Sequence, residues 1–495
     1  MAGRFLTMEK MRDMKYCFLL AVGAVLAVAS GCDREENPGS EPDTRHSVTL
    51  QANAVGNETK NIFDAGGNFY WLPSDAIGLA TVGGDGKTTF SELKWDSETA
   101  YVRSGSFSGE VEGKVGAYAV YPYNTNHKLS GTTLTYNLPS SYTYDSVDTD
   151  FYSAGSTSYI NSSNAPAYGV IAGEGNNLST EFKHLGGVLC IKIDKMPANK
   201  GYVTLTADRK IAGNFTVDLS AETPELTTST ETASEGNSIT IDYWAVEGAS
   251  GVFYFPLPVG KYNVTLTVGF QKVPTTTMYS CTTASRSLEI SRRDVKKLSV
   301  TYATIAKTGY CCYNGYKFID LDLPSGTLWA ETNVGASGIY GIGRFYTWGE
   351  TEIKSSYSEP DSYEKYNSTD KLTTLENDND AAYVNWGSFC RMPSKAEFDE
   401  LIKYCTWKSD GSNGMWFTST LNGNSVFFPY TGYKYDDVNP SVGLGGFYWT
   451  REITADACNR AYDFRVYNTG TAETLWDQRW GGYAVRAVVE KVIEK

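Results

Sequence analysis

The loop after residue 429 combines aromatic rings with side chains that form hydrogen bonds. Tyrosine rings stack on the apolar C–H faces of sugars, while carboxylate and amide groups bind sugar hydroxyls. Glycine and proline bound the loop, and recognition residues commonly stand on loops that a rigid scaffold holds. We therefore predict a ligand-binding site at Tyr430, Tyr433, Tyr435, Asp436, Asp437 and Asn439.

Catalytic chemistry finds little support in the residues around that loop. Residues 310–495 contain no histidine, which excludes Ser-His and Cys-His catalysis there. Asp378 and Asp380 offer closely spaced oxygens that calcium prefers, but Asp378 could equally cap a short helix, and capping is the favoured interpretation. Whether calcium binds there is left open. We predict no catalytic residue, no resident metal and no cofactor.

The cysteines indicate burial more than chemistry. Seven of them follow Cys32, so they cannot all pair within the chain. They show no spacing with histidine that is typical of zinc sites, and we expect mostly buried thiols with one or two disulfides, whose pairing the sequence leaves open. The seven are Cys190, Cys281, Cys311, Cys312, Cys390, Cys405 and Cys458.

The elements that must position these residues are mainly strands. Between residues 46 and 305, short runs alternate apolar and polar residues and are rich in Thr, Tyr and Val, with Gly, Asn and Pro between them. Examples are residues 47–52, 115–121, 188–193 and 262–268. The spacing favours two β-sandwiches, residues 46–176 and 177–306, with a break near 173–179.

Four motifs in this region resemble the fimbrillin-like (Mfa-like) family of Bacteroidetes surface lipoproteins. They are residues 71–78 (WLPSDAIG), 118–123 (YAVYPY), 182–185 (FKHL) and 255–258 (FPLP). The resemblance covers residues 46 to 305 and implies two transthyretin-like sandwiches in a pilin or related surface protein.

The same resemblance implies assembly by donor-strand exchange, in which a protease removes the first strand and a strand of the next subunit fills the groove. The first strand here is predicted at residues 47–54, so the basic residue in the loop after it, Lys60, is the candidate processing site. The alternative is that this strand stays in place and the protein never polymerises.

Residues 310–495 form a further domain, since they hold eight of the eleven tryptophans. Ser394 and Glu397 form a capping-box pattern before Phe398, Leu401 and other apolar residues at helical spacing, which predicts a helix of about twelve residues. Trp329, Trp348, Trp386 and Trp449 are predicted to lie in the core.

An ordered motif series in this domain resembles the major paralogous domain of Fibrobacter succinogenes. It comprises residues 321–330, 347–351, 391–394, 446–450 and 482–486. The resemblance implies an α+β C-type-lectin-like fold and binding more than chemistry. The expected fold class is therefore mainly β, with two transthyretin-like β-sandwiches followed by an α+β C-type-lectin-like domain.

The N-terminal residues indicate export. Residues 1–31 comprise upstream residues and a signal peptide, whose apolar run at 18–28 is too short to span a membrane. Residues 29–32 (ASGC) resemble the bacterial lipobox, which implies a diacylglyceryl group on Cys32. The polar residues 32–45 form a flexible tether, and their acidic start resembles the signal that sends Bacteroidetes lipoproteins to the surface of the outer membrane.

The charge composition limits the partners that the protein can have. A net charge of −14 and a pI near 4.9 argue against nucleic acid as a partner. We expect a cell-surface adhesion or binding lipoprotein of the outer membrane, a minor or tip fimbrillin that presents its C-terminal domain. The alternative is a non-polymeric glycan-binding lipoprotein that serves nutrient capture. Expected partners are other fimbrial subunits, a host or microbial glycan or protein, and the membrane through the lipid.

Overall fold

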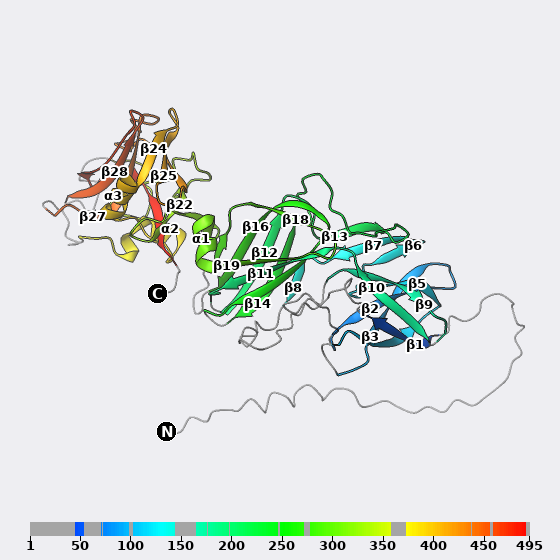
Figure 1. Ribbon diagram of the computed structural model, residues 1–495. Helices are drawn as coiled ribbons and strands as arrows, with labels where there is room; N and C mark the ends of the chain where they lie inside the picture. Colours follow the sequence, from blue (N-terminus) through cyan, green and yellow to red (C-terminus); the bar gives the residue numbers. More distant parts are fainter. Residues whose placement is uncertain are drawn as a thin grey trace, which may run out of the picture. The chain divides into compact units, whose positions relative to one another are not determined.

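The computed structural model of the chain (Figure 1) describes residues 45–53, 71, 73–98, 102–143, 165–175, 177–197, 199–245, 248–271, 278–357, 373–436, 438–455 and 459–491. The predicted lipidation site Cys32, the predicted processing site Lys60 and the predicted ligand-binding residue Asp437 lie outside these ranges. The described residues form a mainly β fold, as the alternating patterns predict. Within the same ranges, no helix has the length and apolar character that a membrane span requires.

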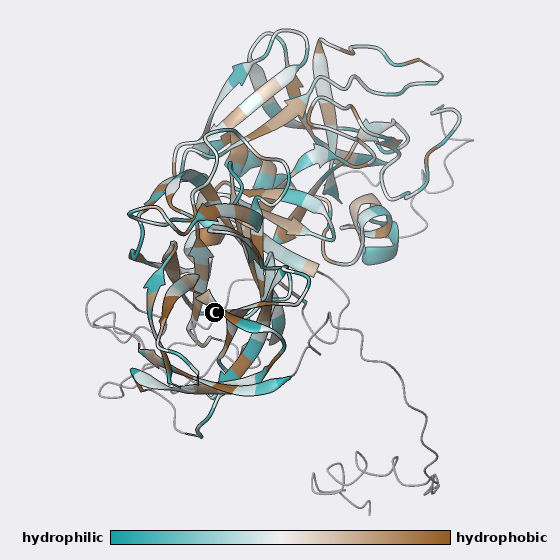
Figure 2. Cartoon of the chain, turned by 90° about the vertical axis from the view of Figure 1, so that its right-hand side faces the viewer, coloured by the Kyte–Doolittle hydropathy of each residue, from teal (hydrophilic) through white to brown (hydrophobic). Residues whose placement is uncertain are grey.

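Seven strands close into a barrel. Buried residues alternate with more exposed ones along β1 and β10, and the strands of the chain carry both hydrophilic and hydrophobic residues (Figure 2). The buried residues of the barrel surround Trp71, which is fully buried. In order around the barrel the strands are β1 (His46–Asn53), β10 (Leu178–His184), β9 (Ala167–Ala172), β5 (Lys114–Tyr121), β2 (Ala76–Val82), β3 (Thr88–Trp95) and β4 (Ser104–Val111).

Strand β1 closes this barrel, because it pairs in parallel with β10 and antiparallel with β4. The barrel therefore extends to His184, beyond the predicted limit of the first sandwich at residue 176, while the division into two sandwiches stays a prediction. The closure itself could not be predicted from the strand pattern. Alternation of apolar residues identifies a strand but carries no information about a pairing partner that is distant in the sequence.

A small sheet of β13 (Gly213–Asp218), β7 (Thr133–Leu138) and β6 (Lys128–Ser130) packs its apolar residues against residues of the barrel strands, such as Val120. His127 lies beside it and is 5% exposed. Its Nδ1 accepts a hydrogen bond from the backbone N–H of Asn137 at 3.0 Å, so Nε2 carries the proton and donates to the Pro122 carbonyl at 3.2 Å.

We predict that His127 makes the protein less stable in mild acid. Burial lowers the pKa of His127 to about 4, from 6.5. Between these two values the unfolded chain binds more protons than the folded chain, so stability rises with pH across this window and is lost as the pH falls. The loss between pH 7 and pH 5 is expected to be about 2 kcal/mol. Urea unfolding at both pH values measures it.

The matched variants for this prediction are His127→Gln and His46→Gln, because His46 is exposed. The first should remove the His127 share of the pH dependence, and the second should leave it unchanged. An equal pH dependence in wild type and His127→Gln would contradict the assignment.

Two further sheets follow the barrel. The first contains β15 (Gly251–Leu257), β11 (Gly187–Asp194) and β19 (Val295–Thr301). The second has ten strands, with β18 (Arg286–Ile290) paired to β16 beside the main path. The order along that path is β31 (Arg486–Glu490), β22 (Thr327–Asn333), β21 (Tyr316–Asp320), β20 (Tyr310–Tyr313), β17 (Met278–Thr282), β16 (Gly260–Gln271), β12 (Asn199–Ala207), β14 (Ser238–Ala245) and β8 (Ser141–Thr143).

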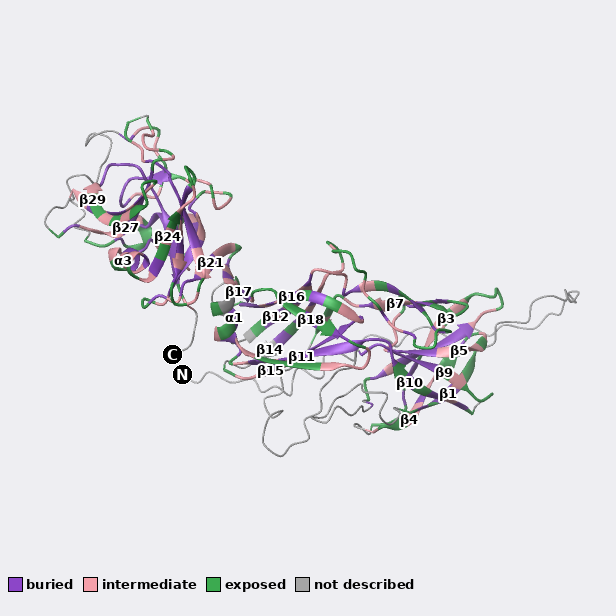
Figure 3. Cartoon of the chain, turned by 45° about the horizontal axis from the view of Figure 1, so that its top comes forward, coloured by how far each residue is buried: buried purple, intermediate pink, exposed green. Residues whose placement is uncertain are grey.

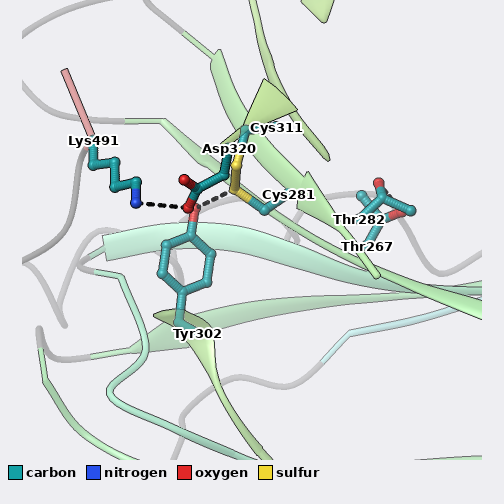
Figure 4. The surroundings of a disulfide bond; sticks show 7 residues. All are labelled: Thr267, Cys281, Thr282, Tyr302, Cys311, Asp320 and Lys491. Atoms are coloured by element: carbon teal, nitrogen blue, oxygen red, sulfur yellow. Dashed lines mark hydrogen bonds and ion pairs between the residues drawn. A yellow bond between two sulfur atoms is a disulfide. The ribbon is translucent and has the colours of Figure 1, made fainter. Parts of the chain in front are cut away.

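The ten-stranded sheet runs across residue 310, where the sequence predicts a new domain. Strand β17 pairs antiparallel with β20, and a disulfide joins the directly opposed residues Cys281 and Cys311 (Figure 4). One hydrophobic cluster contains Val268 of β16 and Trp449 of β27 (Gly445–Ile453). Helix α1 (Tyr302–Thr308) lies between the two disulfide cysteines in the sequence. The domain limits at 306 and 310 stay a prediction. Strand pairing and the hydrophobic cluster both continue across them.

The C-terminal part adds two sheets and two helices. The five-stranded sheet has the order β23 (Phe345–Tyr346), β30 (Tyr483–Ala484), β27 (Gly445–Ile453), β28 (Arg460–Tyr467) and β29 (Thr471–Gln478). The three-stranded sheet contains β24 (Cys405–Ser409), β25 (Gly414–Ser419) and β26 (Ser425–Pro429). The helices are α2 (Ala381–Trp386), preceded by the 3₁₀ turn η4 (Asn377–Asn379), and α3 (Lys395–Tyr404).

The predicted helix and core of this part are confirmed. Helix α3 begins with the predicted capping box, in which Ser394 Oγ accepts the N–H of Glu397 and the Glu397 carboxylate accepts the N–H of Ser394. Buried segments gather in the strands (Figure 3). All four tryptophans that the sequence places in the core are buried: Trp329, Trp348, Trp386 and Trp449.

The cysteines follow the general expectation. Cys281 and Cys311 form a disulfide, and Cys190, Cys390 and Cys405 are buried free thiols. Cys312 is a half-buried free thiol, and Cys458 lies outside the described residues. Burial raises the pKa of the Cys405 thiol to about 12, which keeps it protonated and unreactive at neutral pH.

Candidate functional site

The C-terminal part contains a pocket of about 420 Å³, which we call the aromatic pocket. This volume falls within the range of about 300–1,000 Å³ that is usual for small-molecule sites. Half of its lining residues are aromatic: Tyr433, Tyr435, Phe447, Tyr467, Trp480 and Tyr483. The other lining residues are Lys434, Ser441, Arg465, Asp477, Gln478 and Gly481.

The loop that forms one wall of the pocket is held by backbone bonds to three other segments. Lys434 and Gly482 exchange two backbone hydrogen bonds, of 2.7 and 3.0 Å, which fix the loop to the turn before β30. Asp436 exchanges backbone bonds with Tyr357, and Gly432 pairs with Gly446 of β27. Because these contacts join backbone groups of the chain itself, they hold the loop in place, and binding need not order it.

The aromatic rings of the pocket pack against one another. Tyr433 meets Phe447 edge to face at 4.9 Å between centroids, and Tyr435 lies 5.0 Å from Trp480. Tyr483 stacks on Trp449 of the core at 4.2 Å. The rings differ in exposure, since Trp480 and Tyr483 are buried while Tyr435 is 41% exposed. Tyr435 is therefore the ring best placed to offer a face to a ligand.

A charged network lies at the edge of the pocket. Arg465 of β28 contacts Asp463 through Nε and Nη2, and Nη2 also lies 3.1 Å from Oδ2 of Asp477 on β29. Tyr483 donates its hydroxyl to the same Asp477 oxygen. Burial raises the pKa of Asp463 to about 6, although the Arg465 guanidinium opposes this shift. The ion pair is thus present at neutral pH.

Two polar groups of the lining have spare hydrogen-bonding capacity. The Oε1 atom of Gln478 is buried and has no hydrogen-bond donor. Arg465 uses Nε and Nη2 in the network above, and its Nη1 makes no hydrogen bond to the described residues. The pocket therefore offers a ligand one donor directly, Arg465 Nη1, and one acceptor, Gln478 Oε1, only after the Gln478 side chain turns toward the pocket.

Of the five predicted ligand-binding residues that the structure describes, Tyr433 and Tyr435 line the pocket. Tyr430 is buried, and its hydroxyl donates to Ser409 Oγ at 2.8 Å, which is a structural role. Asn439 donates its Nδ2 to the Thr431 carbonyl at 3.3 Å and so supports the loop from within. Asp436 is exposed beside the pocket and is not part of its lining.

Sequence reasoning missed Arg465, Asp477, Gln478 and Trp480. They follow the predicted loop by about 30 to 50 positions and reach it only because β28 and β29 belong to the sheet beneath it. The one local signal was a tryptophan before two glycines, Trp480-Gly481-Gly482. A glycine is required at 482, since a Cβ there would lie 2.6 Å from Lys434 Cβ and Tyr357 Cδ1.

The acidic run at 376–380 caps a helix, but through a different residue from the one predicted. Asp380 is the N-cap of α2, and its Oδ1 accepts the N–H groups of Ala382 and Tyr383 at 2.9 and 3.1 Å. Its Oδ2 accepts the N–H of Met392 at 2.8 Å. Asp378 lies in η4 instead. Among the residues that the structure describes, no group of three or more His, Cys, Asp and Glu side chains is placed to hold a metal ion.

No protein-family model matches this chain. No curated protein matches it either. Solved structures that are similar include a candidate cell adhesion protein from Bacteroides ovatus, with 14% identity, a TM-score of 0.30, and coverage of 55% of this chain and 96% of that one.

Two fimbrial proteins are also similar. A fimbrial protein from Bacteroides ovatus has 10% identity and a TM-score of 0.21, covering 90% of this chain and 100% of that one. The fimbrial anchor protein Mfa2 from Porphyromonas gingivalis has 9% identity and a TM-score of 0.21, covering 55% of this chain and 99% of that one. At such identities and scores these are likenesses only, and the proposals below depend on the chain's own residues.

Proposed function

We propose that the chain is a cell-surface adhesion protein of the fimbrillin-like kind and that the aromatic pocket is its recognition site. The observation that carries this proposal is the preformed wall of the pocket, in which the loop around Tyr435 is tied by backbone bonds to Gly482 and Tyr357. A rigid pocket with exposed aromatic faces suits binding, because little conformational entropy is lost when the ligand enters. The described lining contains neither histidine nor cysteine, which favours binding over catalysis.

The disulfide supports a location outside the cytoplasm. Bonds such as Cys281–Cys311 form and persist in oxidising compartments. Anchoring of the mature chain to the outer membrane through Cys32 belongs to the same proposal, as does presentation of the C-terminal part to a host or microbial ligand.

Adhesion is tested with the full mature chain displayed on bacteria. Adherence to a surface of host or microbial glycans should fall strongly when Tyr435 is replaced by Ala. Tyr340→Ala is the matched control, since Tyr340 is also an exposed tyrosine of the C-terminal part but does not line the pocket. Equal adherence of Tyr435→Ala and wild type to every ligand surface would refute the proposed site.

We further propose that β1 is a replaceable strand and that the chain occupies a terminal position in a fibre. Strand β1 buries Val48, Leu50 and Ala52 between β10 and β4, so its removal would expose both an apolar slot and two unpaired strand edges. The last strand, β31, is unsuited to donation. It pairs with β22, and its Val488 forms a bridge with Arg391.

A peptide experiment tests the replaceable strand. A protease site inserted after Lys60 allows β1 to be cut and removed after folding, and a peptide of residues 46–53 should then bind the open barrel. Leu50 is fully buried and Gln51 is exposed. Because a buried carboxylate has no partner there, the Leu50→Asp peptide should bind at least about 100-fold more weakly. Fluorescence polarisation of a labelled peptide measures both affinities.

The Gln51→Asp peptide adds the same charge on the outer face and should bind like the unmodified peptide. Peptide binding that is indifferent to Leu50→Asp would overturn the replaceable strand. Fibres formed by the cut chain alone would overturn the terminal position. The alternative, a non-polymeric glycan-binding lipoprotein for nutrient capture, gains support if cells never cut the chain between β1 and β2.

A further inference from the structure

Charges of both signs lie in and beside the aromatic pocket. Lys434 and Arg465 of the lining are cationic and Asp477 is anionic, while Asp463 pairs with Arg465 behind the lining and Asp436 is exposed beside it. Arg465 contacts both Asp463 and Asp477, so neither sign dominates near the exposed rings. A pocket that captured a carboxylate or phosphate would require surplus cationic charge, and one that captured an ammonium group would require surplus anionic charge. The balance favours an uncharged ligand.

The spare hydrogen-bonding groups narrow the chemical class of the ligand further. Gln478 Oε1 lacks a donor and can receive one from a ligand when its side chain turns toward the pocket, while Arg465 Nη1 can donate to a ligand acceptor. Asp477 is 42% exposed and can accept a further hydrogen bond from a ligand. A hydroxyl group donates and accepts at once, so adjacent hydroxyls satisfy groups of both kinds.

The aromatic rings are the third feature of the pocket that bears on its ligand. Tyr435 is 41% exposed with Trp480 packed behind it, and Tyr433 is half-buried. Such rings offer a flat apolar surface beside the hydroxyl-binding groups, and a sugar ring has an apolar C–H face with hydroxyls around its edge. We propose that the aromatic pocket binds one neutral pyranose residue of a glycan, which stacks on Tyr435 and bonds through its hydroxyls to Gln478 and Asp477. This inference rests on the proposed recognition site and assigns its ligand class.

The test uses the full mature chain and defined probes. An array of neutral oligosaccharides identifies a ligand, and calorimetry with the methyl glycosides of glucose, galactose and mannose measures affinity. N-acetylneuraminic acid and protonated glucosamine are the charged probes. Neutral glycans should bind, and both charged sugars should bind at least tenfold more weakly. Tyr435→Ala and Gln478→Leu should each reduce the affinity for the neutral ligand at least tenfold.

The control variants separate this inference from the proposed function. Tyr340→Ala should bind like wild type, and Gln478→Glu should keep part of the affinity because it retains an acceptor oxygen. Equal melting temperatures would show that each variant is folded. Binding of only a charged sugar or a peptide, weakened by Tyr435→Ala, would overturn the neutral-sugar inference and leave the recognition site standing. Absence of any ligand sensitive to Tyr435→Ala would overturn both.

Discussion

Replacing Arg486 by methionine is expected to lower the free energy of unfolding by about 4 kcal/mol. Arg486 is fully buried on β31, and no carboxylate neutralises it among its hydrogen-bond partners. Its guanidinium donates to the backbone carbonyls of Ala330 and Phe427, both at 2.7 Å, and to Asn333 Oδ1 at 2.9 Å. Burial lowers the pKa of Arg486 to about 10, so the side chain remains charged at neutral pH.

The size of this effect follows from what methionine leaves behind. Each buried acceptor without a donor costs about 1–3 kcal/mol, and at least three acceptors lose theirs. Part of that cost is offset because a buried charge no longer has to be desolvated. Three separate strands, β22, β26 and β31, meet at this guanidinium, so its loss should loosen the C-terminal part as a whole.

Urea unfolding followed by tryptophan fluorescence measures the change. Arg286→Met is the control, because Arg286 is exposed on β18 and its loss should change stability by less than about 0.5 kcal/mol. The stability of Arg486→Lys should lie between those of Arg486→Met and Arg286→Met. An ammonium group keeps the charge, but it cannot span acceptors on opposite sides. Unfolding of Arg486→Met at the wild-type urea concentration would refute the structural role of the guanidinium.

Local patterns predicted the elements of this fold better than their connections. Alternation identified the strands, and Ser394 with Glu397 identified the start of α3, because both signals lie within a few residues of the element they describe. Barrel closure by β1 and β10, and the sheet that crosses residue 310, depend on pairing between distant segments. No local spacing encodes such pairing.

The same contrast between local signals and distant contacts applies to the candidate site. Tyr433 and Tyr435 stand in one loop whose composition already suggested recognition, and the structure places both in the pocket wall. Tyr430 belongs to the same loop, yet it points into the core and bonds to Ser409. Composition cannot tell which side of a loop faces inward. Gln478 and Trp480 come from the end of β29 and the turn after it, and only the five-stranded sheet brings them to Tyr435.

The double variant Cys281→Ala/Cys311→Ala is expected to lose about 3 to 4 kcal/mol of stability, the loop-closure value for the 30 residues that the disulfide spans. That span contains α1 and joins β17 to β20, so the bond restricts the chain where the sheet crosses residue 310. Tyr302 donates its hydroxyl to Cys281 Sγ at 3.3 Å, and Lys491 pairs with the buried Asp320 nearby, at 2.7 Å (Figure 4). The first contact holds α1 against β17, and the second holds the residue after β31 against β21.

Calorimetric or urea unfolding of the double variant, compared with wild type treated with dithiothreitol under denaturing conditions, separates the covalent bond from the side-chain packing. Both samples should lose similar stability, because Cys281 and Cys311 are buried and alanine removes only a small volume beyond the bond itself. Cys312→Ala is the matched control, since it removes the adjacent free thiol and should cost less than about 1 kcal/mol. If the double variant were as stable as Cys312→Ala, the reduced chain would already hold β17 against β20 through the sheet and the shared core, and the disulfide would add nothing to that junction.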